Sequence, residues 1–383
     1  MVFKSFYKFH NIKNQLLSNL IFILIPGITL CQKEPVTKVI TIFNSPLKEC
    51  IATDKHIWVL DEAGTIKRFL IDSYDLVDSI KLNKKIVAIA KNASDSIIVA
   101  DQDGLVFKIF DSGEINLLSQ TGQSIQTILF SKEGKCFLIT TKGIYDLQLK
   151  KLYHDDHPYS NFAMPLFKSD GWKPSTVFID NDDKIWLGFD VGEWGGDIVI
   201  FSTKTKQFIK FKEKRKEFCY IRPVRSFFQV DKKMYIVTSL QHFMVNSSII
   251  ELTHNKCNYL FESPKYGKDK FKEIHNMIDS QALYLGPTIF NPGDSSIYFY
   301  CQIGIYKGSI FTDLSKIENW SLVLKPDFIW YYGMPAAVGY SMNVSKMLFE
   351  KSKLYVVSPA NGILIWDGAQ AVILKTSYKP PKN

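Results

Sequence analysis

The chain has 383 residues, of which 46% are hydrophobic and 22% are charged. This composition is ordinary for a folded globular protein and excludes a wholly disordered chain, and the length allows one large domain or two average ones. The formal net charge is +9, but basic and acidic residues are intermixed, as in KFKEKRKEF at Lys210–Phe218. We interpret that tract as a solvated loop, and because no nucleic-acid-binding motif accompanies it, we expect no nucleic-acid partner.

Residues 1–31 have the pattern of a targeting segment and are set apart from the fold. A basic start without acidic residues precedes an apolar stretch of about 15 residues, Leu16–Leu30. A bilayer span needs roughly 20 such residues. The stretch ends at Cys31 in ITLC, which resembles a bacterial lipoprotein signal, although the residue before the cysteine is usually small and here is Leu30.

This resemblance implies lipidation of Cys31, a membrane contact through that lipid anchor only, and a place in the bacterial cell envelope, at the outer membrane or in the periplasm. Plain secretion and an uncleaved anchor are the alternatives. The other five cysteines are far apart and form no CxxC, so we predict neither a disulfide framework nor a zinc cage. Cys136 and Cys301 lie in apolar runs, where we expect them to pack as small hydrophobic residues.

After the targeting segment, one unit recurs seven times. It consists of an apolar strand, a polar turn and a second strand that starts near a glycine, with period-two alternation rich in β-branched and aromatic residues. Adding one strand on each side gives four short antiparallel strands per unit. The pattern predicts an all-β fold, a seven-bladed β-propeller forming a single domain over residues 32–383, with six or eight blades as alternatives. The units are Asp54–Phe69, Ser94–Phe110, Glu133–Leu147, Asn181–Phe201, Asp231–Leu252, Gly293–Gly308 and Glu350–Gly368.

The unit Asn181–Phe201, with its Asp-rich turn, IWLG, Gly and apolar strand, resembles the repeats of two-component-regulator-type and related bacterial β-propellers. HIWVL…GTIKRF and LYVV…NGILIWD are weaker copies. The resemblance implies the fold and a structural role for Trp186, but no activity; a sensor domain is a further hypothesis that follows from it alone. The run at Val36–Phe43 is either the inner strand of the first blade or a strand that pairs with the last blade and closes the ring.

Two neighbouring units, the fourth and the fifth, are longer than the other repeat units. Six positions separate Trp58 from Gly64, whereas ten separate Trp186 from Gly196, and the fifth unit is similarly long near His242. In a blade with strands a to d counted from the centre, these b–c loops share one face with the d–a connectors. We therefore expect insertions to gather over blades four to seven on that face, since the long connectors are His154–Pro174, Glu262–Pro287 and Lys325–Met342.

Aromatic-rich loops on a rigid scaffold are a usual place for binding. We predict a surface that binds a protein or a glycan, with a lid packed over the channel as the structural alternative. The predicted ligand-binding residues are Trp172, Glu193, Trp194, His242, Phe243, Trp330, Tyr331 and Tyr332.

No motif demands catalysis, because the chain contains no GxSxG, P-loop or GxGxxG. HDDH at His154–His157 specifies no third metal ligand, and DNDD at Asp180–Asp183 lacks the calcium-loop pattern. We therefore predict a monomeric binding or scaffold module without metal, cofactor or catalytic residue. The alternative is a hydrolase or lyase acting on a glycan or peptide at the mouth of the channel, for which Glu193 alone is too little, since glycoside hydrolysis usually needs two carboxylates.

Overall fold

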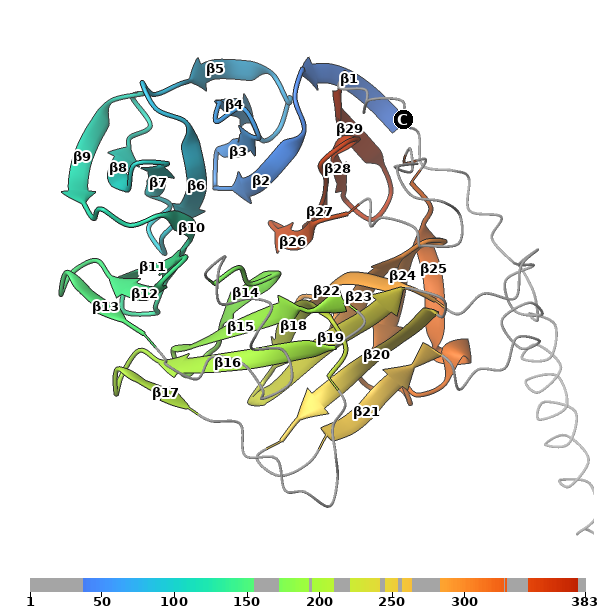
Figure 1. Ribbon diagram of the computed structural model, residues 1–383. Helices are drawn as coiled ribbons and strands as arrows, with labels where there is room; N and C mark the ends of the chain where they lie inside the picture. The colour runs from blue at the N-terminus through green and yellow to red at the C-terminus, as the bar shows by residue number, and fades with distance from the viewer. Residues whose placement is uncertain are drawn as a thin grey trace, which may run out of the picture.

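Seven antiparallel sheets follow one another around a ring in this computed structural model (Figure 1). The structure describes residues 37–154, 172–192, 195–209, 221–241, 245–253, 257–263, 283–326, 328 and 344–377. Each sheet holds four consecutive strands, and the last sheet holds a fifth strand from the start of the described chain, so the predicted seven-bladed β-propeller is confirmed. Among the described residues, no helix is long and apolar enough to cross a membrane.

The strands of each blade run from the innermost to the outermost in chain order. Blade 1 holds β2 (Leu47–Ala52), β3 (His56–Asp61), β4 (Ile66–Leu70) and β5 (Leu76–Ile80). Blade 2 holds β6 (Ile86–Lys91), β7 (Ile97–Asp101), β8 (Leu105–Ile109) and β9 (Ile115–Gln120). Blade 3 holds β10 (Ile125–Phe130), β11 (Cys136–Thr140), β12 (Gly143–Asp146) and β13 (Lys151–Tyr153).

The second half of the ring has the same order. Blade 4 holds β14 (Thr176–Ile179), β15 (Lys184–Asp190), β16 (Gly196–Ser202) and β17 (Gln207–Ile209). Blade 5 holds β18 (Val224–Val230), β19 (Lys233–Gln241), β20 (Val245–Leu252) and β21 (Cys257–Glu262). Blade 6 holds β22 (Leu285–Asn291), β23 (Ser296–Cys301), β24 (Gly304–Ser309), the 3-10 helix η3 (Ile317–Asn319) and β25 (Trp320–Leu324). Blade 7 holds β26 (Lys346–Glu350), β27 (Lys353–Ser358), β28 (Gly362–Trp366) and β29 (Ala371–Thr376).

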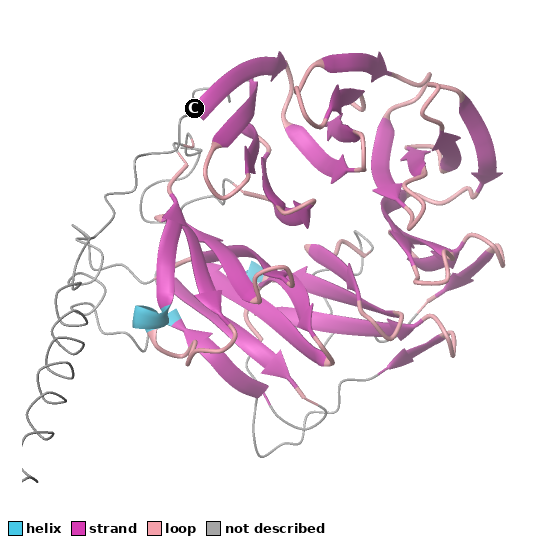
Figure 2. Ribbon diagram, turned by 180° about the vertical axis from the view of Figure 1, so that it is seen from behind, coloured by secondary structure: helices cyan, strands magenta, loops and turns pink. Residues whose placement is uncertain are grey.

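The antiparallel order gives the ring two distinct faces. The a–b and c–d turns of every blade lie on one face, which we call the turn face. The b–c turns and the d–a connectors lie on the other, which we call the loop face. Seen from behind, the ring is again built of strands joined by turns and loops (Figure 2).

The hydrophobic core is divided among the seams between neighbouring blades. Successive side chains of a strand point to opposite faces of its sheet, so each central strand serves two seams. In β3, Trp58 and Leu60 pack towards blade 2, while Ile57 and Val59 pack towards blade 7. Such a strand is buried on both faces, which is why its sequence is an almost continuous apolar run.

The same rule places Trp186 of β15. Ile185 and Leu187 fill the seam with blade 3, and Trp186 fills the seam with blade 5. Its Nε1 donates a hydrogen bond to Asp180 Oδ2 at 2.8 Å, so the indole is both buried and satisfied. Trp186 is therefore a core residue, as the repeat pattern predicted.

The chain closes the ring by adding β1 (Thr37–Phe43) to blade 7. This strand pairs in parallel with β29, starting with Thr37 opposite Ala371, and Figure 1 shows the blue strand beside the red one. The backbone N–H of Ser377 donates to the carbonyl of Phe43 at 2.7 Å. Of the two predicted places for this run, the one in the last blade is correct, and blade 1 has its own complete set of strands.

The repeated glycine allows the chain to pass close to a neighbour. Gly64 has φ +83°, and a Cβ there would lie 2.7 Å from the backbone N of Ile86, the first residue of β6. At Gly104, with φ +82°, a Cβ would lie 2.6 Å from the carbonyl oxygen of Gln123. In both blades the turn after the second strand abuts the connector that enters the next blade, which leaves no room for a side chain.

The cysteines differ partly from expectation. Cys136 and Cys301 are buried and free, which confirms their predicted role as small hydrophobic residues. Cys257, at the start of β21, is disulfide-bonded. We predicted no disulfide framework, and this bond has no local sign in the sequence, because neither a CxxC nor any close pair of cysteines is present.

We expect Phe43→Ala to lower the free energy of unfolding by about 3–5 kcal/mol, because it leaves a cavity in the seam that closes the ring. Phe43 is 1% exposed and lies edge-on to Phe69, with ring centroids 5.8 Å apart. Val39→Ala in the same strand is the matched control, since Val39 is 54% exposed; its effect should stay within about 0.5 kcal/mol. Denaturant unfolding measures both, and equal losses would contradict the role of this seam.

Candidate functional site

The extra residues of blades 4 and 5 lengthen their central strands. In blade 1 the β3–β4 pairing ends at Leu60 opposite Ile66, and in blade 4 the β15–β16 pairing ends at Asp190 opposite Gly196. The connecting turns are therefore equally long, and the surplus of blade 4 lies in the hairpin itself. The predicted long loops are thus longer hairpins, because residue spacing alone does not distinguish strand from turn.

Blade 5 extends further in the same direction. Its central strands β19 and β20 have nine and eight residues, and their pairing continues to Gln241 opposite Val245. Figure 1 shows β15, β16, β19 and β20 as long neighbouring strands. Two adjacent hairpins therefore extend towards the loop face, where the connectors between blades 3 and 7 also begin and end.

Arg225 lies where these two hairpins meet the innermost strand. The register between β18 and β19 shifts between Val224 and Ser226, so Arg225 is the extra residue of a β-bulge. A bulge redirects the side chain that it carries. In this case, the guanidinium reaches residues of the blades on both sides.

The guanidinium of Arg225 joins blades 4, 5 and 6. Its Nη1 donates to Asp190 Oδ2 at 2.7 Å, and its Nε and Nη2 donate to the carbonyl of Ser239 at 3.2 and 3.1 Å. It also lies over the ring of Tyr284, 5.4 Å from the centroid. Charge-assisted hydrogen bonds of this kind are stronger than neutral ones, so Arg225 links both long hairpins near their turn ends.

Tyr284 is the apolar wall behind this ion pair and is 6% exposed. Burial raises the pKa of Tyr284, because the phenolate would lose its hydration; Arg225 acts in the opposite direction and Asp190 adds to the rise. The backbone N–H of Tyr284 donates to Gln302 Oε1 at 2.8 Å. The side chain is therefore held in place and neutral at physiological pH.

A layer of buried hydroxyl groups lies beneath the ion pair. Ser239 and Ser247 form a hydroxyl pair at 2.6 Å, and Ser247 also donates to the carbonyl of Leu283 at 2.7 Å. Thr238 and Ser248 form a second pair at 2.9 Å. All four hydroxyl residues are fully buried. Because each hydroxyl has partners, we assign the layer to structure, joining blades 5 and 6.

The described part of the site thus offers a rigid rim with one partly exposed ion pair. The side chains of Arg225 and Asp190 are 21% and 32% exposed, so both can meet a ligand. The serines below them are inaccessible as nucleophiles. Among the described residues, no group of three His, Cys, Asp or Glu side chains could hold a metal ion.

Trp172 is the one predicted ligand-binding residue within the described chain. It is 3% exposed and packs in the seam between blades 3 and 4, edge-on to Phe189 and Phe208. Its backbone N–H donates to the carbonyl of Thr141 at 2.8 Å. In this structure Trp172 therefore packs as a structural residue, which is the alternative to the predicted ligand-binding role.

The remaining predicted residues lie outside the described residues, so their ligand-binding role stays a prediction. They are Glu193, Trp194, His242, Phe243, Trp330, Tyr331 and Tyr332. Cys31, predicted to carry a lipid, also lies outside them.

The two acidic motifs of the sequence, HDDH and DNDD, are described by the structure to different extents. Of HDDH, the described residues include His154 alone, whose Nδ1 lies 2.7 Å from the carbonyl of Lys142. In DNDD, Asp180 Oδ1 accepts the backbone N–H groups of Asp182 and Lys184 at 2.9 and 2.8 Å. Since its Oδ2 binds Trp186, Asp180 organises the a–b turn of blade 4.

Comparison with known proteins identifies no family. No family model matches the chain, and no curated protein matches it. The resemblance to two-component-regulator-type propellers therefore stays a prediction.

Among solved structures, 1459 chains match. One is the computationally designed Ika8 protein, at 10% identity over 88% of each chain and with a TM-score of 0.51. Another is PorZ, an essential bacterial surface component of the type-IX secretion system of Porphyromonas gingivalis, at 10% identity and a TM-score of 0.49. That match covers 90% of this chain but 40% of PorZ.

The likeness to Ika8 shows the fold alone, and a fold shared by so many chains does not select one function. Propellers present loops on a rigid ring, and this fold fits a binding or scaffold module. A more specific function depends on the residues of the rim formed by the two long hairpins.

We expect Arg225→Met to lower the free energy of unfolding by about 1–3 kcal/mol, because it leaves Asp190 and the carbonyl of Ser239 without their charged donor. Lys233→Met is the control in the same blade, because the exposed Lys233 Nζ lies 3.2 Å from Glu251; its loss should stay below about 1 kcal/mol. Thermal or denaturant unfolding distinguishes the two. Equal losses would show that Arg225 is one more surface charge.

The raised pKa of Tyr284 makes stability depend on pH in the alkaline range. The folded state keeps the phenolic proton to higher pH than the unfolded state, whose tyrosine pKa is about 10. The stabilisation is complete below that value and is lost as the pH rises above it. Between about pH 8 and 11, the free energy of unfolding should therefore fall less steeply with rising pH for Tyr284→Phe than for the original chain. An equal dependence of the free energy of unfolding on pH in both proteins would contradict the raised pKa of Tyr284.

Proposed function

We propose that this protein is a binding or scaffold module whose partner docks on the loop face of blades 4 to 7. The observation that carries the proposal is the pair of adjacent long hairpins, β15–β16 and β19–β20, joined near their turn ends by Arg225. Insertions gathered on one face of a rigid scaffold are typical of binding surfaces.

The partner that this face suits best is a protein or a glycan. The turn of the blade 4 hairpin contains Trp194, and the connector between blades 6 and 7 contains Trp330, Tyr331 and Tyr332. Aromatic rings supply large amphipathic contact areas at little conformational cost. The ion pair of Arg225 and Asp190, partly exposed near the turn ends of the long hairpins, supplies a polar anchor.

We further propose that the ring is tethered to the bacterial cell envelope through a lipid on Cys31. Two observations support this proposal. Residues 1–31 resemble a lipoprotein signal, apart from Leu30 before the cysteine, and Cys257 is disulfide-bonded. Disulfides form and persist in oxidising compartments such as the periplasm and the cell surface.

The docking face can be tested with a photo-crosslinking amino acid placed at Trp194 and, as the control, at Phe311. Phe311 is 82% exposed in the c–d turn of blade 6, on the turn face. With cells of the source organism, we expect a specific crosslinked protein or glycan from position 194 and none from position 311. Crosslinks of equal yield and identity from both positions would contradict a docking site on the loop face.

The tether can be tested by mass spectrometry of the mature N-terminus. We expect a diacylated or triacylated Cys31 as the first residue, and Cys31→Ala should release the protein from the membrane fraction. An N-terminus that retains Met1 would contradict lipid anchoring, and a mature chain that begins near residue 31 without lipid would indicate secretion.

A further inference from the structure

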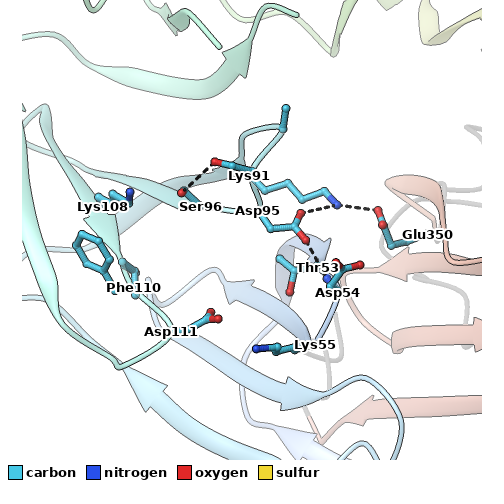
Figure 3. A pocket seen from close by; sticks show the side chains of 13 residues that line it. Thr53, Asp54, Lys55, Lys91, Asp95, Ser96, Lys108, Phe110, Asp111 and Glu350 are labelled. Carbon is cyan, nitrogen blue, oxygen red and sulfur yellow. Dashed lines mark hydrogen bonds and ion pairs between the residues drawn. The ribbon is translucent and has the colours of Figure 1, made fainter. Parts of the chain in front are cut away.

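A pocket of about 760 Å³ opens on the turn face, opposite to the proposed docking surface (Figure 3). The a–b turns of blades 1 and 2 line it, together with the c–d turn of blade 2 and Glu350 of blade 7. Its volume lies within the range of roughly 300–1,000 Å³ that small-molecule sites occupy. Neither the repeat pattern nor the long loops of the sequence predicted a pocket on this face.

One end of the pocket carries fixed negative charge. Lys91 Nζ lies 2.8 Å from Glu350 Oε2 and 3.2 Å from Asp95 Oδ1. Asp95 Oδ2 also accepts the backbone N–H of Asp54 at 3.0 Å. One ammonium therefore faces two carboxylates that are only 25% and 33% exposed, which leaves this end with an excess of one negative charge. The carboxylate of Asp54 lies at the same end, where it is paired with Lys351 Nζ at 3.3 Å.

The other end carries positive charge. Lys108 Nζ lies 4.7 Å from the centroid of the Phe110 ring, and Lys55 lines the floor. Neither lysine has an ion-pair partner within the part of the chain that the structure describes. Asp111, at the rim, is 68% exposed and lies 3.9 Å from His56 Nδ1. Figure 3 shows Lys108 and Phe110 on the side away from Lys91 and Glu350.

We propose that this pocket binds a short peptide with free amino and carboxyl termini. The ammonium group would meet Asp95 and Glu350, whose two carboxylates share the single ammonium of Lys91, and the carboxylate would meet Lys108 and Lys55. Separated charges of opposite sign suit a dipolar ligand, since each end then gains charge-assisted hydrogen bonds. The volume exceeds the needs of a single amino acid, and Phe110 offers an apolar surface for the middle of the peptide. This site is independent of the docking surface on the loop face.

Titration calorimetry with three matched probes tests the proposal. The probes are trialanine, N-acetyl-trialanine and trialanine amide, which differ only in the charge of one terminus. We expect trialanine to bind at millimolar concentration or better, and each capped form to bind about tenfold more weakly or worse, because each loses a charged contact. Absence of trialanine binding, or equal binding of all three probes, would overturn the proposal.

Two variants test which residues contact each terminus of the peptide. Lys108→Met should abolish the preference for trialanine over its amide, and Glu350→Gln should reduce the preference for trialanine over the N-acetyl form. Lys135→Met is the control on the turn face of blade 3, where Lys135 forms an exposed ion pair with Glu133 at 2.7 Å; both preferences should persist. Since Glu350 also joins blade 7 to blade 2, its variant can be misfolded, and then Lys108→Met decides alone. Unchanged preferences in Lys108→Met would overturn the assignment.

Discussion

Every central strand of this ring is buried on both faces, and the rest of the structure depends on that constraint. A blade so built cannot be stable without a neighbour on each side, because half of its apolar residues would face water. Six seams follow from chain order, and the seventh joins blade 7 to blade 1. There β1 adds Phe43 to a cluster that also holds Tyr355 and Phe69. The parallel strand thus covers the edge of β29 and fills the last seam with the same segment.

Closure of the apolar seams leaves the two faces with different tasks. In blades 1 and 2 the central hairpin ends early, in a turn with a positive-φ glycine at Gly64 and Gly104. In blades 4 and 5 the paired strands continue outwards, and a side chain from a bulge holds them together. Arg225 reaches Asp190 in one neighbour and Tyr284 in the other. The described core of the site is therefore a joint between blades, and its strength comes from charged donors that are partly shielded from water.

The sequence was sufficient for the fold because each unit repeats the same local physics. Alternation, β-branched and aromatic residues and turn signals indicated the blades, and Trp186 was identified as core from its place in the repeat. Arg225 and Lys91 were not predictable in this way. Their partners in other blades, Asp190 and Glu350, lie 35 and 259 positions away in the sequence, and nothing in the local pattern marks such a pair. Spacing likewise revealed extra residues in blade 4, but it did not show that they extend a hairpin. For Trp172 the sequence left both a binding and a packed role open, because a connector position carries no sign of whether its side chain turns inwards.

The pocket on the turn face lies where the ring closes, and this position has a thermodynamic consequence. Lys91 and Glu350 join blade 2 to blade 7 past blade 1, and Lys346 joins blade 7 to Glu49 of blade 1 at 2.7 Å. Partly exposed ion pairs contribute little to stability by themselves, so the apolar seam holds the closure and these pairs set its geometry. The lining of the pocket exists as one surface only when blades 1, 2 and 7 are assembled. A ligand that contacts all three would bind the closed ring and not an opened one, and by mass action it would stabilise the closure.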